Sequence, residues 1–119
     1  MPFVVDFYED ESGSAPVEEF LDGLSKKPRA KMVARIKLLE EQGVKLPFPY
    51  SSQVEGRIRE LRARFAKERV RILYFADSQR SFILLHGIVK RTDKLEETDI
   101  RIARERMMKH EEKIKGKRK

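Results

Sequence analysis

The apolar positions near the N-terminus are strand-like at first and then helical. Residues Phe3–Tyr8 form a short run rich in Phe, Val and Tyr that ends at the acidic turn 9–13, a pattern typical of a strand. From Val17 onward, apolar residues recur after three, four and seven positions, which predicts a helix. We expect Ser14 to be its N-cap, because a serine hydroxyl accepts a hydrogen bond from a free backbone N–H group.

A second helix is predicted between Pro28 and Gly43. Proline suits the first turn of a helix and glycine favours its end, and an apolar stripe that starts at Met32 lies between them. The two helices should form a helical hairpin. Residues 44–52 contain two prolines and are expected to form a loop.

After this loop the spacing changes toward alternation, which is typical of strands. The links between the predicted strands are short enough for antiparallel hairpins. The third strand is apolar on both faces, so we expect it to be central and covered. The three predicted strands are Glu55–Arg64, Arg69–Ala76 and Phe82–Lys90.

A last helix is predicted from about Leu95, and the charged residues 115–119 are expected to be a frayed basic tail. Residues 1–114 should then form a single domain. Together these elements predict an α+β fold, with a small antiparallel-dominated sheet, an N-terminal helical hairpin and a C-terminal helix. Their order is β-α-α-β-β-β-α.

Composition narrows the class of protein. Of the 119 residues, 39% are apolar and 39% are charged, in agreement with one small domain. The lack of cysteine excludes disulfides and thiolate metal sites, and two histidines leave little for a His-rich centre, so we expect no metal and no cofactor. The sequence begins without signal-peptide features and has no apolar run of membrane length, so we expect a cytoplasmic protein.

The net charge of +7 is concentrated in the second part of the chain. Residues 1–50 contain 7 basic and 9 acidic residues, whereas residues 51–119 contain 20 and 11. Between Gly56 and Arg71 there are seven basic residues, and six of them are arginines, whose planar fork suits phosphate. This density predicts a polyanion-binding surface. One alternative is a solvated strand pair; a membrane surface is weaker, because such binding normally uses a basic helix.

The usual catalytic motifs are missing from the sequence: phosphate-binding Gly-rich loops, a nucleophile elbow, HExxH and a paired acidic metal motif. Their absence disfavours nucleotide hydrolysis and metal-dependent nuclease action. Basic residues can still cleave RNA, because the 2′-OH is an internal nucleophile beside the phosphorus. Guanidinium groups can stabilise the extra negative charge of the transition state. A metal-free ribonuclease is therefore one interpretation of the basic strands.

Four stretches, in this order and spacing, resemble a known family of toxins: Gly56–Arg62, Val70–Tyr74, Leu84–Arg91 and Asp99–Arg106. With the order of the elements, they are similar to the RelE/HigB superfamily of bacterial toxins, and within it to the phage-derived HigB-like branch. The resemblance spans nearly the whole chain. It rests on the combination of the four stretches with the order of the elements, because no single stretch is specific to the family.

The resemblance implies the toxin of a type II toxin-antitoxin system that enters the ribosomal A site. Its expected activity is that of an endoribonuclease, an mRNA interferase that cuts mRNA without metal by 2′-OH attack. A cognate antitoxin is also implied, often a helix-turn-helix DNA-binding protein. The alternative function is a non-catalytic toxin of the same fold that binds DNA gyrase or rRNA. The third possible function is that of a partner-binding domain, whose charges only give solubility.

Site residues follow from the same resemblance. Arg71 falls where the related strand carries an arginine at the scissile phosphate, and Lys90 and Arg91 fall where the next strand ends in basic residues. Strand alternation places Arg71 on the face of Leu73 and Phe75, so its alternative role is a rim arginine paired with an acid. The predicted catalytic residues are Arg59, Arg71, Lys90 and Arg91, and the predicted RNA contacts are Arg57, Arg62, Arg64 and Lys94.

Three residues each have two interpretations. Glu60 is either a general base or an ion-pair partner that orients Arg62 or Arg71. Tyr74 either stacks on a base or packs in the core, and His86 is either buried and hydrogen-bonded or an exposed proton carrier. In each case the structural role is the more common one.

The proton carrier is left open by the sequence. Several relatives place a Tyr or His near the C-terminal end for proton transfer, but no tyrosine follows Tyr74 here, and His110 is expected to be solvated. The partner is better defined. An antitoxin should present acidic residues or a helix that covers the Arg-rich face or displaces the last helix.

Overall fold

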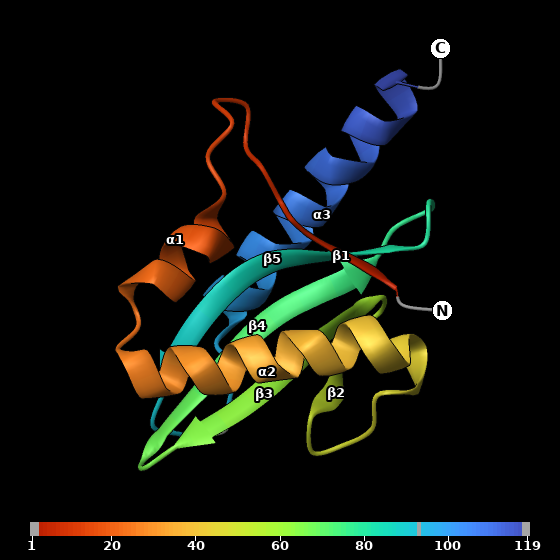
Figure 1. The fold of residues 1–119 in the computed structure, drawn as a ribbon. Coiled ribbons are helices and arrows are strands. Elements are labelled where there is room, and N and C mark those ends of the chain that lie inside the picture. Colours follow the sequence, from red (N-terminus) through yellow and green to blue (C-terminus); the bar gives the residue numbers. More distant parts are fainter. Residues whose placement is uncertain (1–2, 93, 118–119) are drawn as a thin grey trace.

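The computed structural model describes residues 3–92 and 94–117 of the chain (Figure 1). The elements follow in the order β1 Val4–Phe7, α1 Pro16–Gly23, α2 Lys26–Gln42, the short 3-10 helix η1 Gly43–Lys45, β2 Ser51–Glu55, β3 Ile58–Phe65, β4 Glu68–Ala76, β5 Ser81–Lys90 and α3 Glu97–Lys117.

A five-stranded mixed sheet with the order β1-β5-β4-β3-β2 forms the centre of the molecule. Strands β2 to β5 are antiparallel neighbours, and β1 lies parallel to β5 at the far edge. The predicted α+β class and the antiparallel-dominated sheet are confirmed. Strand β5 lies between β1 and β4, as its apolar sequence predicts, and its side chains are buried from Phe82 to Leu85.

One strand was missed by the sequence interpretation. The prediction of a loop through Ser52 and one strand from Glu55 is wrong, because the chain pairs as β2, reverses at Gly56 and Arg57, and continues as β3. Gly56 has a φ of 54°, a left-handed conformation that glycine adopts without the steric cost of a side chain. Two-residue hairpin loops favour such residues.

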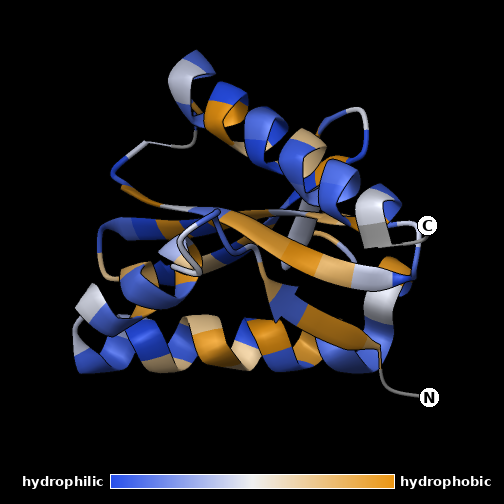
Figure 2. Ribbon diagram, turned by 90° about the horizontal axis from the view of Figure 1, so that it is seen from above, coloured by the Kyte–Doolittle hydropathy of each residue, from blue (hydrophilic) through white to orange (hydrophobic). Residues whose placement is uncertain are grey.

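The helices cover both faces of the sheet. Figure 2 shows α2 on one side of the strands and α3 on the other, and α1 lies on the side of α2 (Figures 1 and 2). Each side has its own apolar cluster. Strand β4 contributes to both through alternate residues, with Val70, Ile72 and Tyr74 on the α1/α2 side and Leu73 and Phe75 on the α3 side.

Both N-terminal helices begin near the expected positions. The N-cap of α1 is Ala15 and not Ser14. The Ser14 hydroxyl lies 3.1 Å from Ser12 Oγ, and its backbone N–H donates to the Asp10 carboxylate at 3.0 Å. Helix α2 begins at Lys26, two residues before the position predicted from the proline. Its C-cap is Gly43, whose φ of 58° and close contact with the Phe3 ring both disfavour a larger residue.

Helix α3 covers one half of its sheet face. Its contacts extend from His86, bound by Asp99 in the first turn, to Asp77, bound by His110. The prediction that His110 is solvated is wrong: its Nε2 lies 3.0 Å from Asp77 Oδ2, and its ring packs edge-on against Phe75.

The end of α3 also differs from the prediction. The helix continues through Lys117, so residues 115–117 are not a frayed tail, and predicted tail residues 118–119 lie outside the described part of the chain. No helix within the described residues combines the length and the apolar character needed to cross a membrane.

Candidate functional site

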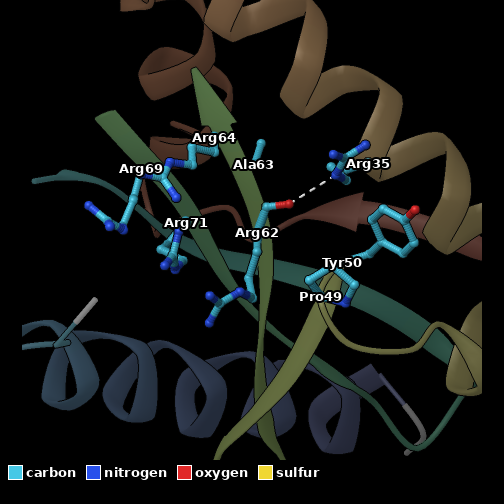
Figure 3. A pocket seen from close by; sticks show the side chains of 8 residues that line it. All are labelled: Arg35, Pro49, Tyr50, Arg62, Ala63, Arg64, Arg69 and Arg71. Atoms are coloured by element: carbon cyan, nitrogen blue, oxygen red, sulfur yellow. Dashed lines mark hydrogen bonds between the residues drawn. The ribbon is translucent and has the colours of Figure 1, made fainter. Parts of the chain in front are cut away.

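Four arginines meet on the half of the sheet beyond the first turn of α3. Strand pairing places Arg62 opposite Arg71 and Arg64 opposite Arg69, and alternation directs these side chains to the α3 side of the sheet. They contribute to a pocket of about 300 Å³ that opens at the edge of β3 (Figure 3). We call it the arginine pocket; its lining residues are Arg35, Pro49, Tyr50, Arg62, Ala63, Arg64, Arg69 and Arg71.

The buried carboxylate of Glu60 contacts two of these arginines, Arg62 and Arg71. Its Oε1 lies 3.0 Å from Arg71 Nε, and its Oε2 accepts hydrogen bonds from Arg62 Nη1 at 3.2 Å and from Ser52 Oγ at 2.6 Å. The side chains of Arg71 and Glu60 are only 3% and 8% exposed. Both carboxylate oxygens are thus engaged, which agrees with the role of an ion-pair partner that orients the arginines.

The pocket has a second wall from helix α2 and the turn before β2. Arg35 donates from Nε to the backbone oxygen of Arg62 at 3.0 Å (Figure 3). Lys31 donates to the backbone oxygen of Arg64 at 2.8 Å. These bonds satisfy carbonyl groups at the sheet edge, where β2 no longer pairs with β3. The Arg35 guanidinium also packs on the Tyr50 ring, 4.8 Å from its centre.

Two predicted residues do not belong to this pocket. Arg59 is one position out of phase with Glu60 and Arg62, so it faces the α1/α2 side, where it donates to Ser51 Oγ at 3.1 Å and to Gln53 Oε1. The prediction that groups Arg59 with Arg71 is therefore not supported by the geometry.

Arg57 lies at the opposite end of the sheet, in the turn between β2 and β3. It forms a two-pronged ion pair with Glu111 of α3, at 2.7 and 2.5 Å, and packs on the Phe75 ring. The hydrogen-bonded carboxylate raises the pKa of Arg57, and the guanidinium lowers the pKa of Glu111. Arg57 therefore joins α3 to the sheet rather than lining the arginine pocket.

The basic residues at the end of β5 and just after it lie beside the pocket. Lys90 is paired with Arg69 across the strands, and its Nζ donates to the backbone oxygen of Lys94 at 2.9 Å and lies 3.5 Å from Glu96 Oε1. Arg91 receives a hydrogen bond on its backbone oxygen from Arg69 Nη1 at 2.7 Å. Lys90, Arg91 and Lys94 thus shape the segment that borders the pocket.

Sequence reasoning missed Arg69, Arg35 and the turn that carries Tyr50 as parts of the site. Arg69 was accessible from the sequence, because it is two residues before Arg71 on the same strand and shares its face. Arg35 and the turn were not, because only the packing of α2 and the start of β2 against β3 brings them there.

Tyr74 and His86 each form a hydrogen bond within the fold. Tyr74 is buried on the α1/α2 side, and its hydroxyl is 2.7 Å from Ser51 Oγ, so the core interpretation is confirmed. The half-buried His86 has Nε2 3.0 Å from Asp99 Oδ1, in agreement with a hydrogen-bonded histidine that ties β5 to α3. In the parts of the chain that the structure covers, no three His, Asp or Glu side chains gather to hold a metal ion.

Placing like charges directly opposite each other on neighbouring strands destabilises a sheet. Glu60 compensates part of this repulsion between Arg62 and Arg71, but four arginines around one buried carboxylate leave the pocket positively charged, which favours a bound anion. Guanidinium groups bind phosphate through paired N–H donors, and Arg64 and Arg69 are exposed enough to reach one. The pocket can bind phosphate groups and stabilise additional negative charge on them.

The fold and the pocket define a small α+β protein with a pocket lined by arginines. The family described as phage derived protein Gp49-like (DUF891) matches residues 19–108, which include every residue that lines the arginine pocket. The chain belongs to this Gp49-like family. The family is toxin-like and is part of the RelE/HigB-like superfamily. No curated protein matches the sequence.

Proposed function

We propose that this protein is the toxin of a type II toxin-antitoxin system, of the HigB-like kind, and that it cuts mRNA on the ribosome. The arginine pocket carries the proposal. Its two opposed arginine pairs, with Arg71 held by the buried Glu60, form a rigid site for the phosphate that is cut. The toxin-like family supports the assignment, and a cytoplasmic location follows from a ribosomal target.

In the proposed reaction the 2′-oxygen attacks the adjacent phosphorus and the bond from phosphorus to the 5′-oxygen breaks. The 2′-hydroxyl loses a proton and the leaving oxygen gains one, so the products end in a 2′,3′-cyclic phosphate and a 5′-hydroxyl. Arginines stay protonated at neutral pH, so they stabilise charge rather than carry protons. Each well-placed donor of this kind contributes about 10²–10³ in rate.

The role of each arginine in the pocket is assigned from its contacts and its burial. Arg71, fixed by Glu60, is assigned to the scissile phosphate, and Arg62 supports the developing negative charge beside it. Arg64 is exposed and Arg69 is half-buried, and both bind neighbouring phosphates. Lys90, Arg91 and Lys94 lie beside them and extend the basic surface. This role was predicted from the sequence for Lys94, whereas Lys90 and Arg91 were predicted as catalytic residues.

The test is to add purified protein to ribosomes that carry a defined mRNA and to map the new 5′ ends. We expect cuts on ribosome-bound mRNA, none on naked mRNA, and none where a single 2′-deoxynucleotide replaces the nucleotide before the cut. Cutting that survives the 2′-deoxy replacement would overturn the reaction. No cut under any condition would favour the alternative toxin that binds DNA gyrase or rRNA.

A further inference from the structure

We propose that the turn Pro47–Tyr50 is a platform for a nucleobase, and that Phe48 stacks on an unpaired base beside the arginine pocket. The inference deepens the proposed function and rests on it for the class of ligand, single-stranded RNA. It assigns a base-binding role to residues outside the set of arginines.

Phe48 is exposed although its side chain is large and apolar. It keeps 68% of its surface accessible, whereas most other phenylalanines of the described chain are buried or half-buried. Exposing an aromatic ring of this size forgoes the stabilisation that burial would give. An exposed aromatic group beside a basic pocket is the arrangement by which proteins bind single strands.

The turn that presents Phe48 is fixed by backbone hydrogen bonds. The N–H groups of Tyr50 and Ser51 both donate to the Pro47 oxygen, at 2.9 and 3.0 Å, and the N–H of Arg62 donates to the Tyr50 oxygen at 2.9 Å. The last bond attaches the turn to β3 at the centre of the pocket. A turn held in this way loses little backbone freedom when a base binds to its side chain.

Arg62 connects the platform with the phosphate site. Its guanidinium lies 5.0 Å from the centre of the Phe48 ring, and its Nη1 donates to Glu60, which also contacts Arg71. Figure 3 shows Arg62 between Arg71 on one side and Pro49 and Tyr50 on the other. One arginine side chain thus separates a stacking surface from phosphate-binding groups, which matches a nucleotide with a base on one side and phosphate on the other.

The chemistry of the platform predicts which nucleic acid it takes. A ring binds any base through its π-face and does not read hydrogen-bonding edges, so the platform is tolerant of sequence. Base faces are accessible only in single strands, so we expect weak binding of a duplex with the same number of phosphates. The occupant is an unstacked base of single-stranded RNA.

The first experiment uses Phe48→Trp as a reporter, because the chain has no tryptophan. A single-stranded 2′-O-methyl RNA oligonucleotide, which cannot be cut by 2′-OH attack, is titrated against this variant. Stacking should quench its fluorescence, and an abasic oligonucleotide of the same length and charge should not. Met108→Trp, at an exposed position on α3, is the matched control and should show no base-dependent quenching.

The second experiment measures affinity by anisotropy of a labelled oligonucleotide. Phe48→Leu keeps an apolar side chain but lacks the π-face, so we expect binding to weaken roughly 5- to 100-fold. Phe48→Tyr should bind like the wild type, and the abasic strand should bind wild type and Phe48→Leu equally. Equal binding of the base-containing strand by wild type and Phe48→Leu would overturn the platform, as would quenching by the abasic strand.

These outcomes separate the platform from the proposed function, because neither experiment depends on cleavage. Base-dependent binding by a protein that never cuts mRNA would retain the platform and reject the ribonuclease. Ribosome-dependent cutting by a protein whose binding does not depend on the base would retain the ribonuclease and reject the platform. If the wild type binds no single strand at all, the platform is wrong.

Discussion

Glu60 and Arg71 lie on neighbouring strands with Oε1 and Nε 3.0 Å apart, and both side chains are almost fully buried. The contact is diagonal, because Glu60 stands opposite Leu73 while Arg71 stands opposite Arg62. A carboxylate in this position fixes the guanidinium before any phosphate arrives. Preorganisation of this kind makes charge stabilisation effective in a transition state.

Replacing Glu60 by alanine should destabilise the fold, because it leaves the Arg71 charge buried without this carboxylate. A hydrogen bond to a charged group contributes about 1.5–3 kcal/mol to stability. We expect a loss of this size in the free energy of unfolding measured with urea. Glu68→Ala, at an exposed position of β4, is the control and should change stability by less than about 0.5 kcal/mol. Equal stability of the two variants would show that the pair is unimportant.

Binding of single-stranded RNA should depend on salt through the phosphates that the arginine pocket neutralises. The logarithm of the affinity falls with the logarithm of salt concentration by about 0.7 per phosphate on single strands. Arg64→Ala should reduce this slope by about one phosphate, whereas Arg59→Ala, on the other face, should not change it. If Arg59→Ala flattens the slope as much as Arg64→Ala, RNA does not bind in the pocket.

The ion pair of Arg57 and Glu111 should make the attachment of α3 dependent on pH. Because Arg57 lowers the pKa of Glu111, the pair stabilises the fold above the ordinary glutamate pKa, and this stability is lost as pH falls through the lowered value. The pair is partly exposed, so we expect about 0.2–1 kcal/mol. The difference in unfolding free energy between wild type and Glu111→Gln should be constant from about pH 5 to 7 and shrink below about pH 4.

Glu112→Gln serves as the control for this pH series, because Glu112 is an exposed neighbour on the same helix. Its unfolding free energy should follow that of the wild type across the range. A Glu111→Gln difference that grows as the pH falls would contradict the assigned sign.

An antitoxin should neutralise this protein by covering the arginine pocket with acidic side chains. Complementary charge directs such partners to a basic face. We expect the purified complex to leave ribosome-bound mRNA intact, while the free toxin cuts it. Equal cutting by the complex and by the free protein would reject occlusion of the pocket.

The sequence predicted the elements better than it predicted the site. Alternation along β4 correctly placed Arg71 with Leu73 and Phe75, because strand geometry is local. The same rule, applied to β3, would have separated Arg59 from Glu60 and Arg62. Strand β2 was missed because its half-exposed, polar sequence lacks an apolar run, and its pairing with β3 supplies the order.

Other features depend on contacts between distant parts of the chain and had no local signal. The partner of Arg57 is Glu111, 54 residues away, and His110 finds Asp77 across the sheet. Arg35 reaches the pocket only because α2 packs along β3. Charge density between Gly56 and Arg71 indicated a polyanion surface, but three-dimensional packing decides which arginines share it.

The most direct test of the central claim compares cutting rates of ribosome-bound mRNA under single-turnover conditions for wild type, Arg71→Lys and Arg59→Ala. Lysine keeps the charge of the buried Arg71 but lacks the planar fork, so we expect a loss of about 10²–10³ in rate, with folding checked by circular dichroism. Arg59→Ala should cut at the wild-type rate. A large loss for Arg59→Ala with an unchanged rate for Arg71→Lys would contradict the assignment of the arginine pocket as the site of RNA cleavage.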